Sequence, residues 1–187
     1  MKSEGGSSAR GVSLWLVPVD EARRALSRLI AELAERLGTP AFAPHLTLVA
    51  GVTRSADDVV RRAGDLALAL EPLSLPLRGP EGRDETFRCL YLPVGETLKL
   101  LATHALARSA LRLGDEPLHE PHLSLVYGTL LPEQRLPLVA ELAPRVTSRV
   151  EFAALEVVRT EGAVANWQSL AVFPFGGPAA GHERNNT

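Results

Sequence analysis

The residues best suited to chemistry lie in an octapeptide that occurs twice. Residues 44–51 read PHLTLVAG, and residues 121–128, 77 positions later, read PHLSLVYG, so six of the eight positions are identical. Within each copy polar and apolar side chains alternate, which is typical of a β-strand. Successive side chains of a strand point to opposite faces. Each copy therefore presents a histidine and a hydroxyl residue on one face and leucines on the other.

The two copies supply His45 with Thr47 and His122 with Ser124. Two residues advance about 6.6 Å along a strand, so a histidine and a hydroxyl can hold one tetrahedral anion such as a phosphate. If the copies face each other, one imidazole can take a proton from water while the other donates one to the leaving oxygen. Histidine suits both steps because its unperturbed pKa is about 6.5. We therefore predict an acid–base pair whose neighbouring hydroxyls bind the anion.

Other interpretations of these residues remain open at this point. A single histidine on an apolar strand is more often a hydrogen-bonded core residue than a catalyst, but a core gains little from burying the same polar pair twice. A module that binds nucleotides without turnover would carry the same residues. A metal site is a further alternative, although two histidines and two hydroxyls lack the third or fourth good ligand of a stable zinc site. We expect no metal and no other cofactor.

Composition limits the class of protein. The 187 residues fit one compact domain or two small lobes, and 45% hydrophobic residues suffice for a core. A net charge of −2 argues against a large non-specific nucleic-acid surface. Cys89 is the only cysteine, so an internal disulfide and a thiolate zinc cluster are both excluded. Without an apolar run of about 18 residues or a signal peptide, we expect a cytoplasmic protein with no membrane partner, and a monomer.

The elements that must position the motifs form an irregular alternation of strands and helices. Apolar spacing of 3.6 residues predicts helices at 21–37, 55–70, 96–113 and 132–142, and alternation predicts strands at 12–19, 45–52, 73–78, 86–94, 122–127, 149–159 and 167–175. Asp20 is an expected N-cap, and Ser55 with Asp58 resembles a capping box. The strands within 73–94 and within 149–175 are expected to form antiparallel hairpins.

This pattern, together with the repeat, predicts an α+β fold. We expect two pseudo-symmetric lobes, each with an antiparallel sheet flanked by helices, and an active-site cleft between them. The expected organisation is a flexible segment at 1–10, a single bilobal domain at 11–175 and a flexible tail at 176–187, because both ends are rich in small and polar residues.

The paired His-x-Thr/Ser strands resemble the signature of the two-histidine phosphoesterase superfamily. Within it, residues 12–175 are similar to the cyclic phosphodiesterases that open ADP-ribose 1″,2″-cyclic phosphate and nucleoside 2′,3′-cyclic phosphates. The resemblance includes residues 13–18 (SLWLVP), residues 87–92 (FRCLYL) and Tyr127, five residues after the second histidine.

The resemblance implies a metal-independent hydrolase of small-nucleotide cyclic phosphodiesters. His45 and His122 would be the acid–base pair, and Thr47 and Ser124 the phosphate ligands. The products would be ADP-ribose 1″-phosphate and nucleoside 2′-phosphates. A related alternative is an enzyme that acts on 2′,3′-cyclic phosphates at RNA 3′ ends, similar to the 2′-5′ RNA ligases.

The same resemblance implies that Trp15 and Tyr127 line the substrate cleft, where an aromatic face can hold a base or a sugar. Tyr127 stands at an odd offset from His122, so strict alternation would place it on the opposite face of the strand. We therefore expect it to reach the cleft only if the strand ends or twists near Val126.

Overall fold

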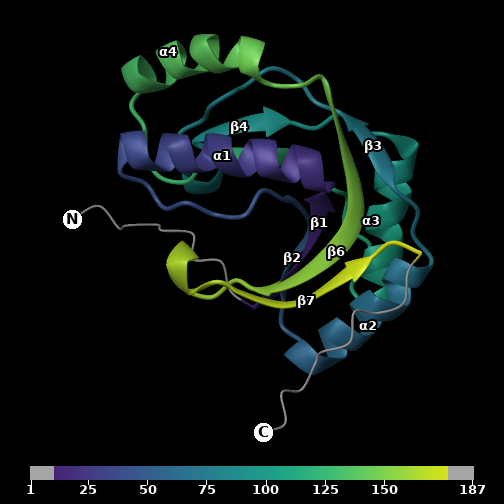
Figure 1. Cartoon of the computed structure of the whole chain (residues 1–187). Helices are drawn as coiled ribbons and strands as arrows, with labels where there is room; N and C mark the ends of the chain where they lie inside the picture. Colours follow the sequence, from purple (N-terminus) through teal and green to yellow (C-terminus); the bar gives the residue numbers. More distant parts are fainter. Residues whose placement is uncertain (1–10, 177–187) are drawn as a thin grey trace, which may run out of the picture.

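The computed structural model describes residues 11–176, and the expectations for the segments 1–10 and 177–187 lie outside the described residues. Within this range the chain forms seven strands and four α-helices (Figure 1). The strands are β1 (Val12–Pro18), β2 (Leu46–Val52), β3 (Leu73–Pro76), β4 (Leu90–Pro93), β5 (His122–Val126), β6 (Arg149–Arg159) and β7 (Gln168–Pro174). The helices are α1 (Asp20–Leu37), α2 (Ala56–Leu68), α3 (Leu98–Ala110) and α4 (Pro132–Leu142).

All seven strands belong to one antiparallel sheet with the order β3-β6-β1-β2-β5-β4, and β7 pairs with β6. The two halves of this sheet meet at β2 and β5 through one residue pair, Leu46 with Leu123. These two leucines are the third residues of the two octapeptides, so a pseudo-two-fold axis passes between them. The predicted α+β fold with two related halves of antiparallel strands is confirmed, and the two halves are continuous at this single pair.

The relation between the halves extends to the neighbouring strands. Trp15 of β1 pairs with Thr47, and Tyr91 of β4 pairs with Ser124. Each octapeptide strand therefore has an aromatic residue beside its hydroxyl residue, on the strand next to it. Residues paired directly across an antiparallel sheet share a face. The aromatic, hydroxyl and histidine side chains of each half consequently occupy the same face.

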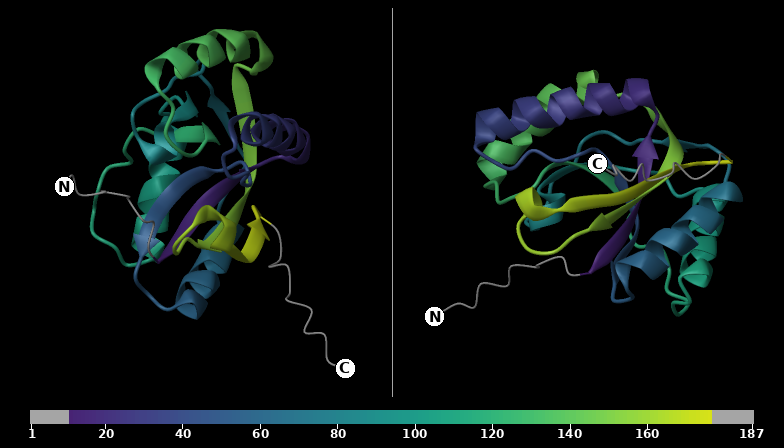
Figure 2. Two further views of the ribbon diagram at one scale, coloured as in Figure 1. Left: turned by 90° about the vertical axis from the view of Figure 1, so that its left-hand side faces the viewer. Right: turned by 60° about the horizontal axis from the view of Figure 1, so that its bottom comes forward.

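The helices form two groups, α1 with α4 and α2 with α3 (Figures 1 and 2), and the buried residues of both groups belong to the core on the leucine face of the sheet. The helix-side leucines of the octapeptides, together with Phe152 of β6, join the apolar faces of α1 and α2 in one buried core cluster. Ion pairs link α1 to the end of α4 and the turn after it, Arg36 with Glu141 and Glu32 with Arg145. No helix between residues 11 and 176 has the length and apolar character to cross a membrane.

Helix ends follow the local sequence with one exception. Gly38 takes φ 65° and ends α1, a conformation that favours glycine. Ser55 accepts a hydrogen bond from the Asp58 backbone N–H at 3.3 Å, as the capping pattern predicts. The expectation that Asp20 caps α1 is wrong: Val19 is the N-cap and Asp20 is the first helical residue, where its charge interacts favourably with the helix dipole.

The predicted hairpin over 73–94 is also wrong. β3 pairs with β6, and β4 pairs with β5. Within 73–94 the chain pairs with itself only at two isolated bridges, Leu77 with Val94 and Glu81 with Tyr91. Two-residue loops fix hairpin register strongly, whereas the long connection here leaves both strands free to choose distant partners. The first residues of the predicted strand 86–94 form a short 3₁₀ turn, η1 (Thr86–Arg88). The hairpin of β6 and β7 is confirmed.

Candidate active site

One cavity of about 200 Å³ gathers all four residues of the paired motifs and both predicted aromatic residues. It opens on the sheet face described above, where the two octapeptide strands meet. Its lining consists of Ser13, Trp15, His45, Thr47, Ala50, Phe87, His122, Ser124, Tyr127, Thr160 and Trp167. Side chains that lie 77 residues apart in sequence therefore share one small space.

The pairing of β2 with β5 explains this convergence. The strands are antiparallel, and Leu46 lies opposite Leu123. One step along each strand from this pair sets His45 across from Ser124, and Thr47 across from His122. Directly opposed side chains of antiparallel strands lie about 5 Å apart at Cβ. The duplicated motif thus forms a square in which each histidine faces the hydroxyl residue of the other copy.

His45 is held in one orientation by three neighbours. Its Nδ1 donates to the Ala43 carbonyl at 2.7 Å, because a carbonyl can only accept. This leaves Nε2 unprotonated, and the Tyr127 hydroxyl donates to it at 3.3 Å. The imidazole stacks on the Trp15 indole with ring centroids 3.5 Å apart and planes 7° apart. Only 5% of His45 is exposed, and this burial lowers its pKa from 6.5 to about 4.

His122 has a similar hydrogen bond and a more polar surrounding. Its Nδ1 donates to the Glu120 carbonyl at 2.8 Å, and the Tyr91 ring meets it edge-on with centroids 5.5 Å apart. The side chain is half-buried. Burial lowers the pKa of His122, the Arg88 guanidinium lowers it further, and the carboxylates of Glu120 and Glu85 oppose that shift. His122 is therefore the more easily protonated of the two histidines.

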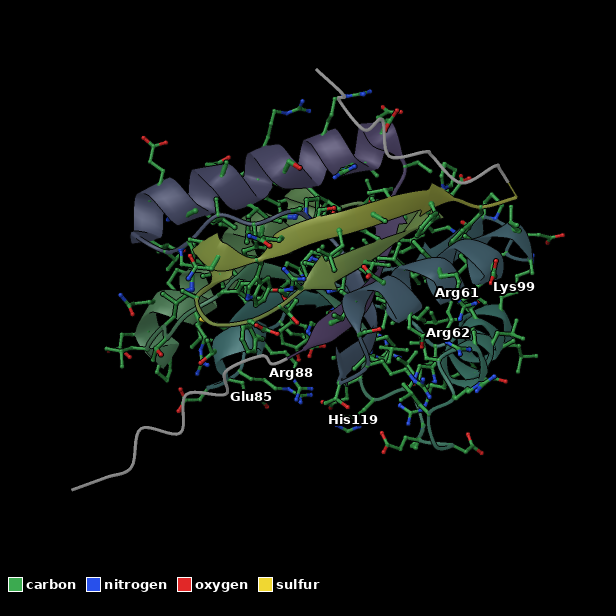
Figure 3. All side chains as sticks on the ribbon, turned by 90° about the horizontal axis from the view of Figure 1, so that it is seen from below. Arg61, Arg62, Glu85, Arg88, Lys99 and His119 are labelled. Carbon is green, nitrogen blue, oxygen red and sulfur yellow. The ribbon has the colours of Figure 1, made fainter. Side chains whose placement is uncertain are left out.

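Glu120 fixes the carbonyl that orients His122. Its backbone takes φ 43°, an uncommon conformation for a non-glycine residue. Both of its carboxylate oxygens accept from Arg83 at 2.8 Å, and Arg88 binds the same carboxylate. These arginines hold the pKa of Glu120 at about 2. Arg88 also pairs with Glu85, and the two side chains lie together in Figure 3. Charged side chains thus anchor the turn that precedes β5.

The two hydroxyls differ in their present partners. The Ser124 hydroxyl donates to the Phe87 carbonyl of η1 at 2.7 Å. Thr47 makes no side-chain hydrogen bond within residues 11–176. The Thr47 hydroxyl is thus available to donate to an anion, whereas that of Ser124 has to rotate away from Phe87 to do so.

Tyr127 reaches the cavity because the strand ends before it. β5 stops at Val126, and Gly128 takes φ 146°. The strand was expected to end or twist near Val126 if Tyr127 is to reach the cavity, and it does end there. Tyr127 is therefore not bound to the alternating side-chain directions of β5. The Tyr127 ring stacks on Phe42 with centroids 3.8 Å apart, and its edge contacts Phe87 at 5.1 Å. Burial raises the pKa of the Tyr127 hydroxyl, so it remains a hydrogen-bond donor.

Three aromatic residues near the cavity were not predicted as site residues. Trp167 and Phe87 line it, and Phe42 packs on Tyr127. Trp167 lies within 6.0 Å, centroid to centroid, of Trp15, Phe87 and Tyr127. The sequence assigned Trp167 only to the start of a strand, and no local pattern marks it, because its neighbours come from distant segments. No three His, Cys, Asp or Glu side chains within residues 11–176 are grouped as metal ligands.

The arrangement can bind one phosphate group and move two protons. Both histidines use Nδ1 for a backbone carbonyl, which leaves Nε2 of each for other partners, and two hydroxyl residues line the same cavity. Aromatic rings cover the surrounding walls, which lowers the local polarity and strengthens hydrogen bonds made inside. An ester of phosphoric acid that enters would meet a proton acceptor, a proton donor and two hydroxyl donors at once.

Comparison with known proteins gives a consistent set of relatives. A sequence profile described as cyclic phosphodiesterase-like protein matches residues 10–175. A cyclic phosphodiesterase of Arabidopsis thaliana is 21% identical over 123 residues, which cover 66% of this chain and 68% of the plant protein. E. coli LigT, solved in complex with 3′-AMP, aligns with a TM-score of 0.58 at 14% identity, covering 89% of this chain and 98% of LigT. LigT solved with phosphate aligns with a TM-score of 0.55 at 13% identity, covering 90% and 99%.

Proposed function

The chain belongs to the cyclic phosphodiesterase-like protein family, and from this premise we propose that it hydrolyses cyclic phosphodiesters of small nucleotides. The substrates would be nucleoside 2′,3′-cyclic phosphates and ADP-ribose 1″,2″-cyclic phosphate. The single observation that carries the proposal is the cavity of about 200 Å³ shared by His45, Thr47, His122 and Ser124. The Arabidopsis relative is a cyclic phosphodiesterase, and LigT has been solved with phosphate and with 3′-AMP, which supports the same substrate class.

In the proposed reaction, water attacks the phosphorus atom of the cyclic diester. One histidine accepts a proton from the water as the new P–O bond forms. The P–O3′ bond breaks, and the other histidine donates its proton to O3′, leaving a 2′-phosphate. Thr47 and Ser124 donate hydrogen bonds to the non-bridging oxygens, whose charge increases in the transition state. These steps need no metal, since the imidazoles carry both protons.

The environments of the two histidines suggest how the roles divide. Both have lowered pKa values, and the shift of His45 to about 4 reflects its complete burial against Trp15. The anionic substrate favours protonation of one imidazole, and the proton goes to the group that accepts it more easily. We assign the acid role to His122, which has carboxylates nearby, and the base role to His45.

The experiment is turnover of adenosine 2′,3′-cyclic phosphate in excess EDTA, with identification of the AMP isomer formed. Wild type should give the 2′-phosphate, and His45→Ala and His122→Ala should each lose at least about 100-fold in kcat. His119→Ala is the matched control, because His119 lies three residues from His122 but is exposed, and it should retain full activity.

The same assay separates the alternatives. Activity that survives loss of both histidines refutes the mechanism. Tight binding of the nucleotide without any product would support a binding module instead. An oligonucleotide with a 2′,3′-cyclic end that is turned over faster than the mononucleotide, with steep salt dependence, would support an RNA-end enzyme. A substrate with a sulfur leaving group at the 3′ position tests the role assignment, because it should rescue His122→Ala and leave His45→Ala inactive.

A further inference from the structure

A second cavity adjoins the one that holds the histidines. Its volume is about 290 Å³, and it shares two lining residues with the first cavity, Trp15 and Trp167. These two indoles, with centroids 5.8 Å apart, therefore stand between the two spaces. The second cavity extends over β6 and β7, which lie side by side in Figures 1 and 2. Its lining includes the carboxylate residue Glu156.

The sheet register sets Glu156 on the same face as the phosphate-binding residues. Glu156 of β6 pairs with Trp15 of β1, and Trp15 pairs in turn with Thr47 of β2. Directly paired residues point to one face, so the three side chains form a row across the sheet. Glu156 is two strands from Thr47, a separation of roughly 10 Å. A ligand with its phosphate at Thr47 would extend over Trp15 to reach Glu156.

Glu156 is buried without a partner. It is 6% exposed, and within residues 11–176 it has no side-chain hydrogen bond and no ion pair. Burying an unpaired carboxylate is costly, and the carboxylates of Asp58 and Glu120 each bind arginines. The Trp167 indole N–H is also buried without a partner among the described residues. A carboxylate without a protein partner and an unsatisfied indole N–H thus belong to the lining of one cavity.

We propose that this second cavity binds the base of the nucleotide substrate and that Glu156 selects guanine; the inference rests on the proposed function. The Watson–Crick edge of guanine carries two adjacent donors, N1–H and N2–H, and one acceptor, O6. The two carboxylate oxygens of Glu156 match the donors in a bidentate pair. The Trp167 N–H matches O6. The faces of the two indoles supply stacking surfaces for the ring.

Other bases satisfy these groups less well. Adenine and cytosine each offer a carboxylate only one exocyclic amino group on that edge, and uracil presents two carbonyl oxygens that would face the negative charge. A bidentate pair of this kind discriminates against the wrong base by about 10- to 100-fold. The cavity beside Tyr91 is larger, at about 590 Å³, but its charged side chains have partners. Glu81 accepts a hydrogen bond from the Tyr91 hydroxyl, and Arg83 is paired with Glu120. A carboxyl side chain without a protein partner among the described residues therefore distinguishes the Glu156 cavity.

The test compares kcat/KM for the 2′,3′-cyclic phosphates of guanosine, adenosine, cytidine and uridine in wild type, Glu156→Gln and Glu156→Met. Wild type should favour guanosine over uridine by about 10- to 100-fold. Both variants should lose that preference mainly through a rise in KM for the guanosine substrate. Glu151→Gln is the matched control, because Glu151 lies on the same strand but is exposed, and it should keep the preference.

Thermal unfolding separates selection of a ligand from a structural role. Removing an unpaired buried carboxylate should leave Tm unchanged or raise it, whereas loss of a structural contact would lower it. Binding of guanosine 2′-phosphate by calorimetry gives a readout independent of turnover, and it should weaken in both Glu156 variants. Turnover of all four nucleotides with no guanosine preference, or a preference that survives Glu156→Met, would overturn the inference and leave the proposed function standing. No turnover of any nucleotide would refute the proposed function itself.

Discussion

Burial of His45 should make the stability of this protein fall as the solution becomes acidic. The pKa of His45 is lowered from 6.5 to about 4, first by loss of hydration in a site that leaves 5% of the residue exposed. Below pH 6.5 the unfolded chain binds a proton at this histidine that the folded chain does not accept. The free energy of unfolding therefore decreases as pH falls from 6.5 towards 4, and this contribution is constant outside that window.

The size of the effect follows from the two pKa values. Between about pH 7 and about pH 4.5, linkage gives a loss of about 2 kcal/mol from His45. The measurement is urea unfolding of wild type and His45→Gln at a series of pH values in that range. Titration of other groups, such as the arginine-bound carboxylates of Asp58 and Glu120, is common to both proteins. The difference between the two unfolding free energies should therefore change by about 2 kcal/mol in favour of the variant at the acidic end.

A control variant shows whether the effect belongs to a buried imidazole. His119→Gln removes a histidine that is 81% exposed at its side chain, and its stability should follow wild type at every pH. If His45→Gln and wild type instead gave parallel curves, the imidazole of His45 would titrate equally in the folded and unfolded chains. The stacked, dehydrated environment described for it would then be refuted.

Three further perturbations test other contacts. Tyr127→Phe removes the hydroxyl that donates to His45 Nε2 at 3.3 Å, and kcat should fall by about twofold to tenfold with the fold intact by circular dichroism. Glu120→Gln removes a negative charge that raises the pKa of His122 and leaves Arg88 paired with Glu85 alone, so the limb of the pH–rate profile due to His122 should move to lower pH; a shift to higher pH would contradict this electrostatic account. Phe152→Ala deletes a fully buried ring at the centre of β6 and should cost about 3–5 kcal/mol in chemical unfolding, while a loss below about 1 kcal/mol would mean that the core there closes over the gap.

The sequence predicted the site better than it predicted its surroundings. The octapeptide is a local pattern, and alternation alone sets the face on which His45 and His122 lie. Strand pairing over long separations is not encoded locally. The prediction of a hairpin over 73–94 was wrong because β3 pairs with β6, which lies more than 70 residues further along the chain. Trp167 enters the cavity through the same kind of distant contact, and nothing in its own segment distinguishes it from a core residue.

Glu156 shows a different limit of sequence reasoning. It lies in an alternating strand, where a charged residue is ordinarily assigned to the solvent side. The face opposite the helices is covered here by the segment that carries Phe42 and by the turn before Trp167, so this carboxylate is enclosed. Which face of a sheet meets solvent depends on connections that arrive from elsewhere in the chain. A polar residue enclosed in this way is therefore recognised only in the folded structure.

Duplication explains how two histidines come to line one cavity, and the departures from symmetry explain how they differ. A strict two-fold arrangement would give two imidazoles with identical surroundings and the same pKa. The differences lie next to the motif. Trp15 stacks flat on His45, whereas Tyr91 meets His122 edge-on. The residue two positions before the histidine is Ala43 in one copy and the arginine-bound Glu120 in the other. The backbone hydrogen bond is thus kept in both copies, while burial and charge are changed around it, so the surroundings shift the pKa values of the two imidazoles differently.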